Sequence, residues 1–469
     1  MISSFSAPFT RGRGAVRLAA GTLVSGLVAA TVVATAGTAV ADGTTQNQGG
    51  ATATIGGLKT YGTAVIHDDS GDQQVSAGLF EMSVEGGGTL QTYCVDLYNP
   101  TQKEAQYHET PWSGTSLGVN KDAGRIRWIL QNSYPQVNDL ASLAKKAGVD
   151  GGLTEQDAAA GTQVAIWRYS DGADVDAVDP QAEQLADYLQ KAARSVAEPQ
   201  PSLTLDGSAV SGRPGELLGP VTVRTDASAV SVAPPLDAAI SGVRIVGQDG
   251  KDVTSATDGS RLFFDVPADA APGSAELTVQ ASTTVPVGRA FTSVSRSQTQ
   301  ILAGSSESTV SATATATWAA TGAVPALSAA KNCARSGVDI TAANQGDAAF
   351  TFDLMGTRHT IPAGASRTVT IPLQEDQAYD FTIDGPQTIG NRFTGVLDCK
   401  TQAAETGVTT QTLAEPSPAT VGGTAPTTNL AQTGSSHATP LIAGTAIGLV
   451  VIGGAVLLLV GRKEEGARG

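Results

Sequence analysis

The sequence QTYCVDL at residues 91–97 and the sequence GTQVAIW at residues 161–167 are the most informative stretches of this 469-residue chain. The first lies in one of several short runs separated by Gly and Asp turns, a pattern typical of β-strands. The second lies within residues 154–169, which open with a threonine and an aspartate at the spacing of a helix cap. We therefore predict that Cys94 lies on a strand, that Gln163 lies on a helix, and that tertiary packing joins them.

Residues 42–198, which surround these two stretches, are predicted to form one α+β domain. Strand-like runs come first and are expected at residues 63–66, 78–84 and 89–97. Helical signals follow at residues 121–132, at residues 154–169, and from Asp179-Pro180 onward, where Asp can cap a helix and Pro suits its first turn. The Ala-rich residues 158–160 would let the helix that carries Gln163 approach the strand that carries Cys94 closely.

Residues 162–165 read TQVA and match the TQxA motif, with Cys94 upstream on the predicted strand. Over about residues 50–197 the chain resembles the thioester domains of Gram-positive surface adhesins. The resemblance implies an internal thioester between the side chains of Cys94 and Gln163. It also suggests that Thr162 orients the Gln163 amide or stabilises developing oxyanion charge.

Such a thioester would be a stored electrophile. A thiolate is a strong nucleophile, and folding can hold it against the amide carbon at high effective concentration, so that ammonia leaves. An amine, such as a lysine of a surface protein or an amine-bearing polymer, could then attack and leave a stable amide on Gln163. Because this event happens once, we predict a covalent adhesin rather than an enzyme, and we expect no cofactor.

The same residues allow other interpretations. Cys94 could be an inert buried thiol and Gln163 an ordinary helix-surface residue, and the chain would then be a structural cell-wall spacer or a non-covalent binding protein. Cys94 and His108 could form a cysteine peptidase site, although no peptidase signature surrounds Cys94. The four histidines are too scattered to suggest a metal site for zinc, and residues 68–72 are predicted to be a polar turn rather than a calcium loop.

Two β modules are predicted after the first domain. Residues 199–322 contain short Val- and Thr-rich runs punctuated by Gly, Pro and Asp, which favours an immunoglobulin-like β-sandwich. Residues 323–400 are predicted to form a smaller β-sandwich. Since Cys333 and Cys399 bracket this smaller unit, we predict a disulfide between them, with Cys94 outside any intramolecular pair. Lys–Asn isopeptide crosslinks, which some surface adhesins contain, could use Lys251 or Lys331, but no partner can be chosen.

The N-terminus has the layout of a secretory signal peptide. Residues 1–41 contain a basic region, then an apolar region, and end in Ala39-Val40-Ala41, an A-x-A cleavage site. We therefore predict export of the chain and cleavage after Ala41.

The C-terminus has the layout of a sortase substrate. Residues 401–429 are predicted to be a disordered Thr/Ala/Pro stalk, residues 440–460 a transmembrane helix, and residues 461–469 a cytoplasmic tail. Between stalk and span lies a pentapeptide that resembles the LAxTG sorting signal: Leu430, Ala431, Gln432, Thr433 and Gly434. The resemblance implies that sortase cleaves after Thr433 and transfers it to peptidoglycan, so that the membrane helix anchors the chain only transiently.

Composition agrees with an exported surface protein. The formal net charge is -15, which keeps an exposed protein soluble and argues against nucleic-acid binding. Aromatic residues make up only 5% of the chain. We expect a protein that is mainly β with some α structure, is secreted, and is anchored to the cell wall.

Overall fold

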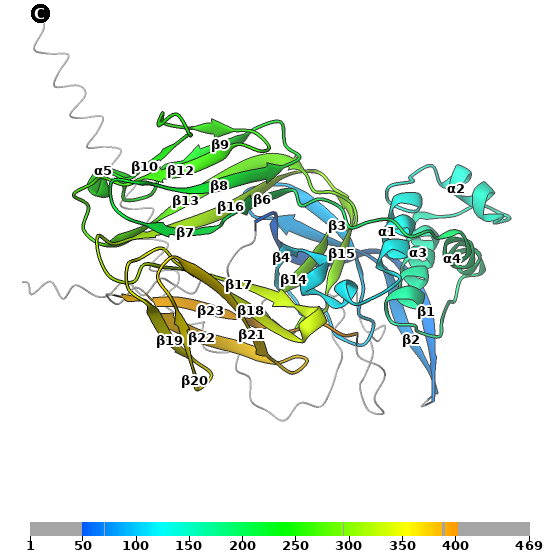
Figure 1. Cartoon of the computed structure of the whole chain (residues 1–469). Coiled ribbons are helices and arrows are strands. Elements are labelled where there is room, and N and C mark those ends of the chain that lie inside the picture. Colours follow the sequence, from blue (N-terminus) through cyan, green and yellow to red (C-terminus); the bar gives the residue numbers. More distant parts are fainter. Residues whose placement is uncertain (1–48, 70, 294, 387–389, 402–469) are drawn as a thin grey trace, which may run out of the picture. The chain divides into compact units, whose positions relative to one another are not determined.

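The computed structural model of the protein describes residues 49–69, 71–293, 295–386 and 390–401. The predicted signal peptide with Ala41, the stalk beyond residue 401, the sortase signal, the transmembrane span and the tail lie outside these residues. Among the described helices, none is long and apolar enough to cross a membrane. The described chain is mainly β with some helices, and an α+β region is followed by β-sheets, as predicted (Figure 1).

An antiparallel sheet of seven strands forms the framework of the α+β region, in the order β2-β3-β15-β14-β4-β1-β5. Because β2 also pairs with β1, six of these strands form a closed ring, and β5 extends from β1. The strands are β1 (Thr52–Asp68), β2 (Gly71–Val84), β3 (Thr89–Cys94), β4 (Gln106–Thr110), β5 (Val175–Ala177), β14 (Ala290–Ser293) and β15 (Gln300–Ser305).

The hairpin of β14 and β15 comes from the range 199–322, which the sequence assigned to the second module. β15 pairs with β3 so that Gln300 lies opposite Cys94, and β14 pairs with β4 so that Ala290 lies opposite Thr110. Pairing between strands about two hundred residues apart leaves no local mark in the sequence, because Val- and Thr-rich strands occur in both regions. The sheet around Cys94 is therefore completed by a distant segment of the chain.

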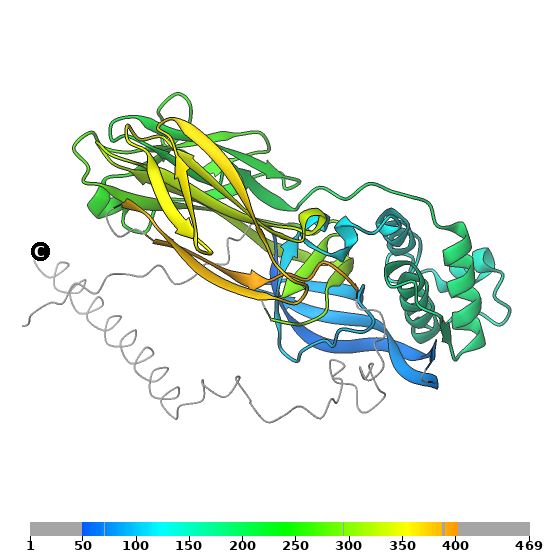
Figure 2. The ribbon, with the colours of Figure 1, turned by 60° about the horizontal axis from the view of Figure 1, so that its bottom comes forward.

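Helix α3, which contains Gln163, lies in the interior of this region. Thr154 and Asp157 form the predicted capping box at its start, and residues 158–167 are all buried. α3 packs against α4 and against β1 and β2 (Figure 2). A Cβ at Gly161 would lie 2.4 Å from the Ala182 carbonyl oxygen, so glycine permits the close approach of α3 to α4. The helices are α1 (Ala123–Asn132), α2 (Leu140–Ala147), α3 (Glu155–Ser170) and α4 (Pro180–Ala192), with short 3-10 turns at Trp112–Gly114 and Ser116–Gly118.

Two further sheets are built from residues 203–318. One has the order β10-β12-β8-β6 and the other the order β11-β9-β13-β16-β7. Buried and half-buried residues alternate along most of β16, as expected for a strand with one face in a core. The elements are β6 (Leu203–Asp206), β7 (Ala209–Gly212), β8 (Leu217–Thr225), β9 (Val230–Ala233), α5 (Ala238–Ser241), β10 (Arg244–Val246), β11 (Ser255–Ala256), β12 (Arg261–Asp265), β13 (Gly273–Thr284) and β16 (Glu307–Trp318).

The smaller C-terminal β unit has a hydrophobic core of its own. The predicted disulfide between Cys333 and Cys399 is present and links residues 66 positions apart. The unit contains a sheet of order β17-β18-β21 and two hairpins, β19-β20 and β22-β23. Its elements are β17 (Pro325–Asn332), the 3-10 turn Cys333–Arg335, β18 (Gly337–Asn344), β19 (Phe350–Leu354), β20 (Thr357–Ile361), β21 (Ala365–Pro372), β22 (Ala378–Asp384) and β23 (Gly390–Val396).

Candidate functional site

Cys94 is the last residue of β3 and is 1% exposed. Gln300, the first residue of β15, lies directly opposite it in the antiparallel ladder. Directly opposed residues project their side chains from the same face of a sheet. The Gln300 Nε2 lies 3.4 Å from the Cys94 Sγ, and Gln300 is fully buried. The structure thus brings a thiol and a carboxamide into contact where water does not reach.

Thr92 holds the other end of the same carboxamide. Its hydroxyl donates a hydrogen bond of 3.0 Å to the Gln300 Oε1. Thr92 and Cys94 are two residues apart on β3, so both side chains lie on the same face of the strand. The Gln300 amide therefore points its nitrogen toward the thiol and its oxygen toward Thr92, which is also fully buried.

Gln163 also reaches Cys94, but it contacts the backbone. Its Oε1 accepts a hydrogen bond of 3.0 Å from the Cys94 amide, and its Nε2 donates one of 2.9 Å to the Cys94 carbonyl oxygen. The pairing of β3 with β2 ends at Thr92, so β2 does not extend to this edge of Cys94. The side-chain amide of Gln163 takes the place of a neighbouring strand there.

The expected contact between the helix of Gln163 and the strand of Cys94 is present. The contact of Gln300 with Cys94 was not predicted from the sequence. The signal that could have drawn attention to Gln300 is the Thr-Gln pair at residues 299–300, which repeats the pair at residues 162–163. Its value becomes clear only from the strand pairing, because nothing local links residue 300 to residue 94.

Thr162, which was predicted to support the Gln163 amide, contacts its own helix and the end of α1. Its hydroxyl donates a 2.6 Å hydrogen bond to the Ala158 carbonyl oxygen, one turn earlier in α3. The same hydroxyl lies 2.5 Å from the Ser133 hydroxyl at the end of α1. The contact with Ser133 ties α3 to the end of α1. The role of Thr162 at the Gln163 amide stays a prediction.

One buried aspartate, Asp96, and two half-buried ones, Asp171 and Asp398, lie close to the segment that carries the thiol. Burial raises the pKa of Asp171 to about 7, and burial raises the pKa of Asp398 to about 6. Burial, together with the charges of Asp171 and Asp398, also raises the pKa of Asp96. Asp171 accepts a hydrogen bond of 3.0 Å from the Leu97 amide, and Asp398 accepts one of 3.1 Å from Thr299. Segments next to both Cys94 and Gln300 are thus held by carboxyl groups that keep their protons to unusually high pH.

A buried ion pair supports the strands around the site. The Arg289 Nε donates to Glu109 over 2.8 Å, with side-chain exposures of 4% and 0%. The Arg289 Nη1 also reaches Glu198 over 2.9 Å. Glu109 further accepts hydrogen bonds from the amides of Ala51 and Ser202. This network joins β4, the residue just before β14, and the segment after α4.

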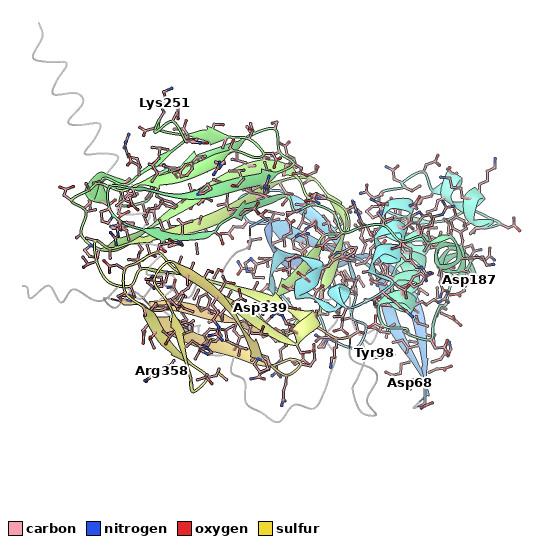
Figure 3. All side chains as sticks on the ribbon, viewed as in Figure 1. Asp68, Tyr98, Asp187, Lys251, Asp339 and Arg358 are labelled. Atoms are coloured by element: carbon pink, nitrogen blue, oxygen red, sulfur yellow. A yellow bond between two sulfur atoms is a disulfide. The ribbon has the colours of Figure 1, made fainter. Side chains whose placement is uncertain are left out.

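The two lysines predicted as isopeptide donors have different surroundings. Lys251 lies on an exposed loop after β10, where it pairs with Asp249 over 3.0 Å (Figure 3). The Lys331 Nζ donates to the Thr292 hydroxyl over 3.3 Å, and burial lowers the pKa of Lys331. Neither contact identifies an asparagine partner, so the isopeptide crosslinks stay a prediction.

A candidate group of cation ligands in the described chain includes Asp398, the aspartate that contacts Thr299. Carboxylate oxygens of Glu375, Asp376 and Asp398 lie within 4.8 Å of one another. The Glu375 Oε1 already accepts hydrogen bonds from the amides of Cys399 and Lys400. These contacts account for Glu375 as a support for the chain after β23.

Part of the α+β region matches a known protein-family model. Residues 91–195 match the family model described as thioester domain. No curated protein sequence matches the chain.

Solved structures provide fold comparisons at low similarity. The Bacillus anthracis TIE protein is 16% identical with a TM-score of 0.26, and the match covers 74% of this chain and 63% of that one. This chain therefore spans less than two thirds of that protein's length. The thioester domain of the Enterococcus faecium TIE86 protein is 14% identical with a TM-score of 0.27, and the match covers 58% of this chain and 97% of that one. The E. coli chaperone DraB is 13% identical with a TM-score of 0.16, covering 42% and 98%.

The thioester-domain match includes both Cys94 and Gln163 and ends before Gln300. The matched family is described by its thioester and not by an enzymatic activity. Residues 91–195 are therefore similar to a thioester domain, and a strand from outside that segment brings Gln300 to the cysteine.

Proposed function

We propose that this protein is a cell-surface adhesin that captures an amine covalently through an internal thioester, and that Cys94 and Gln300 form the thioester. The observation that carries the proposal is the 3.4 Å contact between the Cys94 Sγ and the Gln300 Nε2 on paired, buried strands. The Cys94–Gln163 crosslink implied by the sequence resemblance is the second candidate. Geometry favours Gln300, because both polar atoms of the Gln163 amide bond the Cys94 backbone.

Thioester formation follows from this arrangement. The Cys94 sulfur attacks the Gln300 Cδ, the Cδ–Nε2 bond breaks, and the thiol proton leaves with the nitrogen as ammonia. A carboxamide is a poor acyl donor in water. Holding the thiol in contact with it turns a bimolecular reaction into an intramolecular one, which supplies a large effective concentration.

Amine capture is the second step. A neutral amine attacks the Gln300 Cδ, the Cδ–Sγ bond breaks, and a proton from the amine ends on the sulfur of Cys94. The product is an amide, which does not release the partner, so the protein acts once and is not a turnover enzyme. Because Cys94 is 1% exposed, the fold protects the thioester from water, and an incoming amine needs a local opening of the covering residues.

The proposed location of the protein at the cell surface is based on the signals near the two ends of the sequence. Export by the signal peptide and sortase anchoring at residues 430–434 would attach the protein to peptidoglycan. Apart from β14 and β15, which belong to the sheet around Cys94, the module at residues 199–322 is proposed to be immunoglobulin-like. Together with the smaller β unit, it would hold the reactive site away from the cell wall. The partner is an amine-bearing protein or polymer at a surface.

Intact mass spectrometry of the full chain tests the proposal. The expected mass is one ammonia below the sequence mass, after allowance for the disulfide, and incubation with methylamine should add one methylamine. Cys94→Ala and Gln300→Ala should both remove the deficit. A matched control is Gln298→Ala, a buried glutamine two residues from Gln300, which should keep it. A wild-type chain with its full sequence mass would leave the structural spacer as the better interpretation.

A further inference from the structure

We propose that Thr92 is a catalytic residue of the thioester chemistry, because its hydroxyl stabilises the oxyanion that forms on Gln300. The inference rests on the proposed thioester between Cys94 and Gln300. It is supported by a different contact from the one that supports the thioester, namely the 3.0 Å hydrogen bond from the Thr92 hydroxyl to the Gln300 Oε1.

The position of Thr92 follows from the strand register. Cys94 lies opposite Gln300, and Thr92 lies opposite Leu302, so Thr92 is the diagonal neighbour of Gln300 across the two strands. A long side chain can reach a diagonal neighbour. The Gln300 side chain does so, and its amide spans the distance from the thiol to the Thr92 hydroxyl.

The chemistry needs a donor at this oxygen in both steps. When sulfur attacks the Gln300 Cδ, the carbonyl electrons move onto the Oε1, and the C=O bond reforms as ammonia leaves. When an amine attacks the thioester, negative charge develops on the same oxygen before the Cδ–Sγ bond breaks. A hydroxyl that already donates to this oxygen stabilises both transition states without reorganisation.

Burial and side-chain stiffness make Thr92 suited to this role. Thr92 is fully buried, so water cannot readily replace its hydroxyl. A β-branched side chain has few χ1 rotamers, which keeps the hydroxyl aimed at one position. Thr162, the other candidate donor, instead donates to the Ala158 carbonyl oxygen.

The test compares four substitutions in the full chain: Thr92→Val, Thr92→Ser, Thr92→Ala and, as the competing candidate, Thr162→Val. Intact mass gives the fraction of chains that lack one ammonia, and a time course with methylamine gives the rate of aminolysis. Valine keeps the shape of threonine and removes the hydroxyl. Serine and alanine both lack the methyl group and differ only in the hydroxyl, so this pair carries the comparison if the valine variant does not fold.

We expect Thr92→Val and Thr92→Ala either to retain the full amide mass or to react with methylamine about 10²–10³-fold more slowly than wild type. Thr92→Ser should form the thioester and react within about tenfold of wild type, and Thr162→Val should react as wild type does. If the wild-type chain shows the deficit and the valine and alanine variants form and lose it at the wild-type rate, the role of Thr92 is overturned while the thioester stands. If the wild-type chain shows no deficit, the proposed function itself fails.

Discussion

Replacing Gln163 by leucine tests the interpretation that its amide substitutes for a strand beside Cys94. Leucine has a similar volume but cannot bond the Cys94 amide or carbonyl group. Both backbone groups are buried with Cys94, and they would lose hydrogen bonds of 3.0 Å and 2.9 Å. A buried polar group left without a partner costs about 1–3 kcal/mol. We therefore expect Gln163→Leu to lower the free energy of unfolding by about 2–6 kcal/mol.

Urea unfolding followed by intrinsic fluorescence suits this measurement, since buried Trp167 lies one turn further along α3. A matched control is Gln156→Leu, an exposed glutamine on the same helix, which should change stability by no more than about 0.5 kcal/mol. A Gln163→Leu chain as stable as this control would refute the idea that the amide completes the hydrogen bonding of β3.

Three further predictions concern the surroundings of the site. Arg289→Met leaves the buried Glu109 without its charge partner and should lower the free energy of unfolding by about 3–5 kcal/mol in a urea titration, and an unchanged midpoint would count against the network. The pKa of Asp171 is about 7, so the native state keeps a proton that the unfolded chain releases near pH 4. Wild-type thermal stability should therefore fall as the pH rises from about 4 to 7, and Asp171→Asn should reduce this dependence, whereas an equal slope in both chains would contradict the assignment. Reducing the disulfide of Cys333 and Cys399, which closes a loop of 66 positions, should destabilise the smaller β unit by about 4 kcal/mol, and calorimetry with and without reductant measures the difference.

Local features of the site could be predicted from the sequence. The capping box of Thr154 and Asp157 marks the start of α3, and the short run around Cys94 indicates a strand. The helix and strand signals lie within a few residues, so local preferences are enough to predict them. The disulfide was predictable because two of the three cysteines bracket one compact unit.

The partner of the thiol could not be predicted in the same way. Gln300 reaches Cys94 through the pairing of β3 with β15, and such pairing depends on the register of strands far apart in the chain. Thr92 gains its contact with Gln300 only as a result of that register. The raised pKa values of Asp171 and Asp398 likewise depend on burial by distant segments.

Gln300 is the residue that we propose as the acyl donor, first to the Cys94 sulfur and then to the amine. After reaction of the native wild-type chain with methylamine, digestion and fragmentation of the peptides would locate the new methylamide. Our account predicts the methylamide on residue 300 and an alkylatable thiol on Cys94. A methylamide on Gln163, or reaction without any modified glutamine, would contradict it.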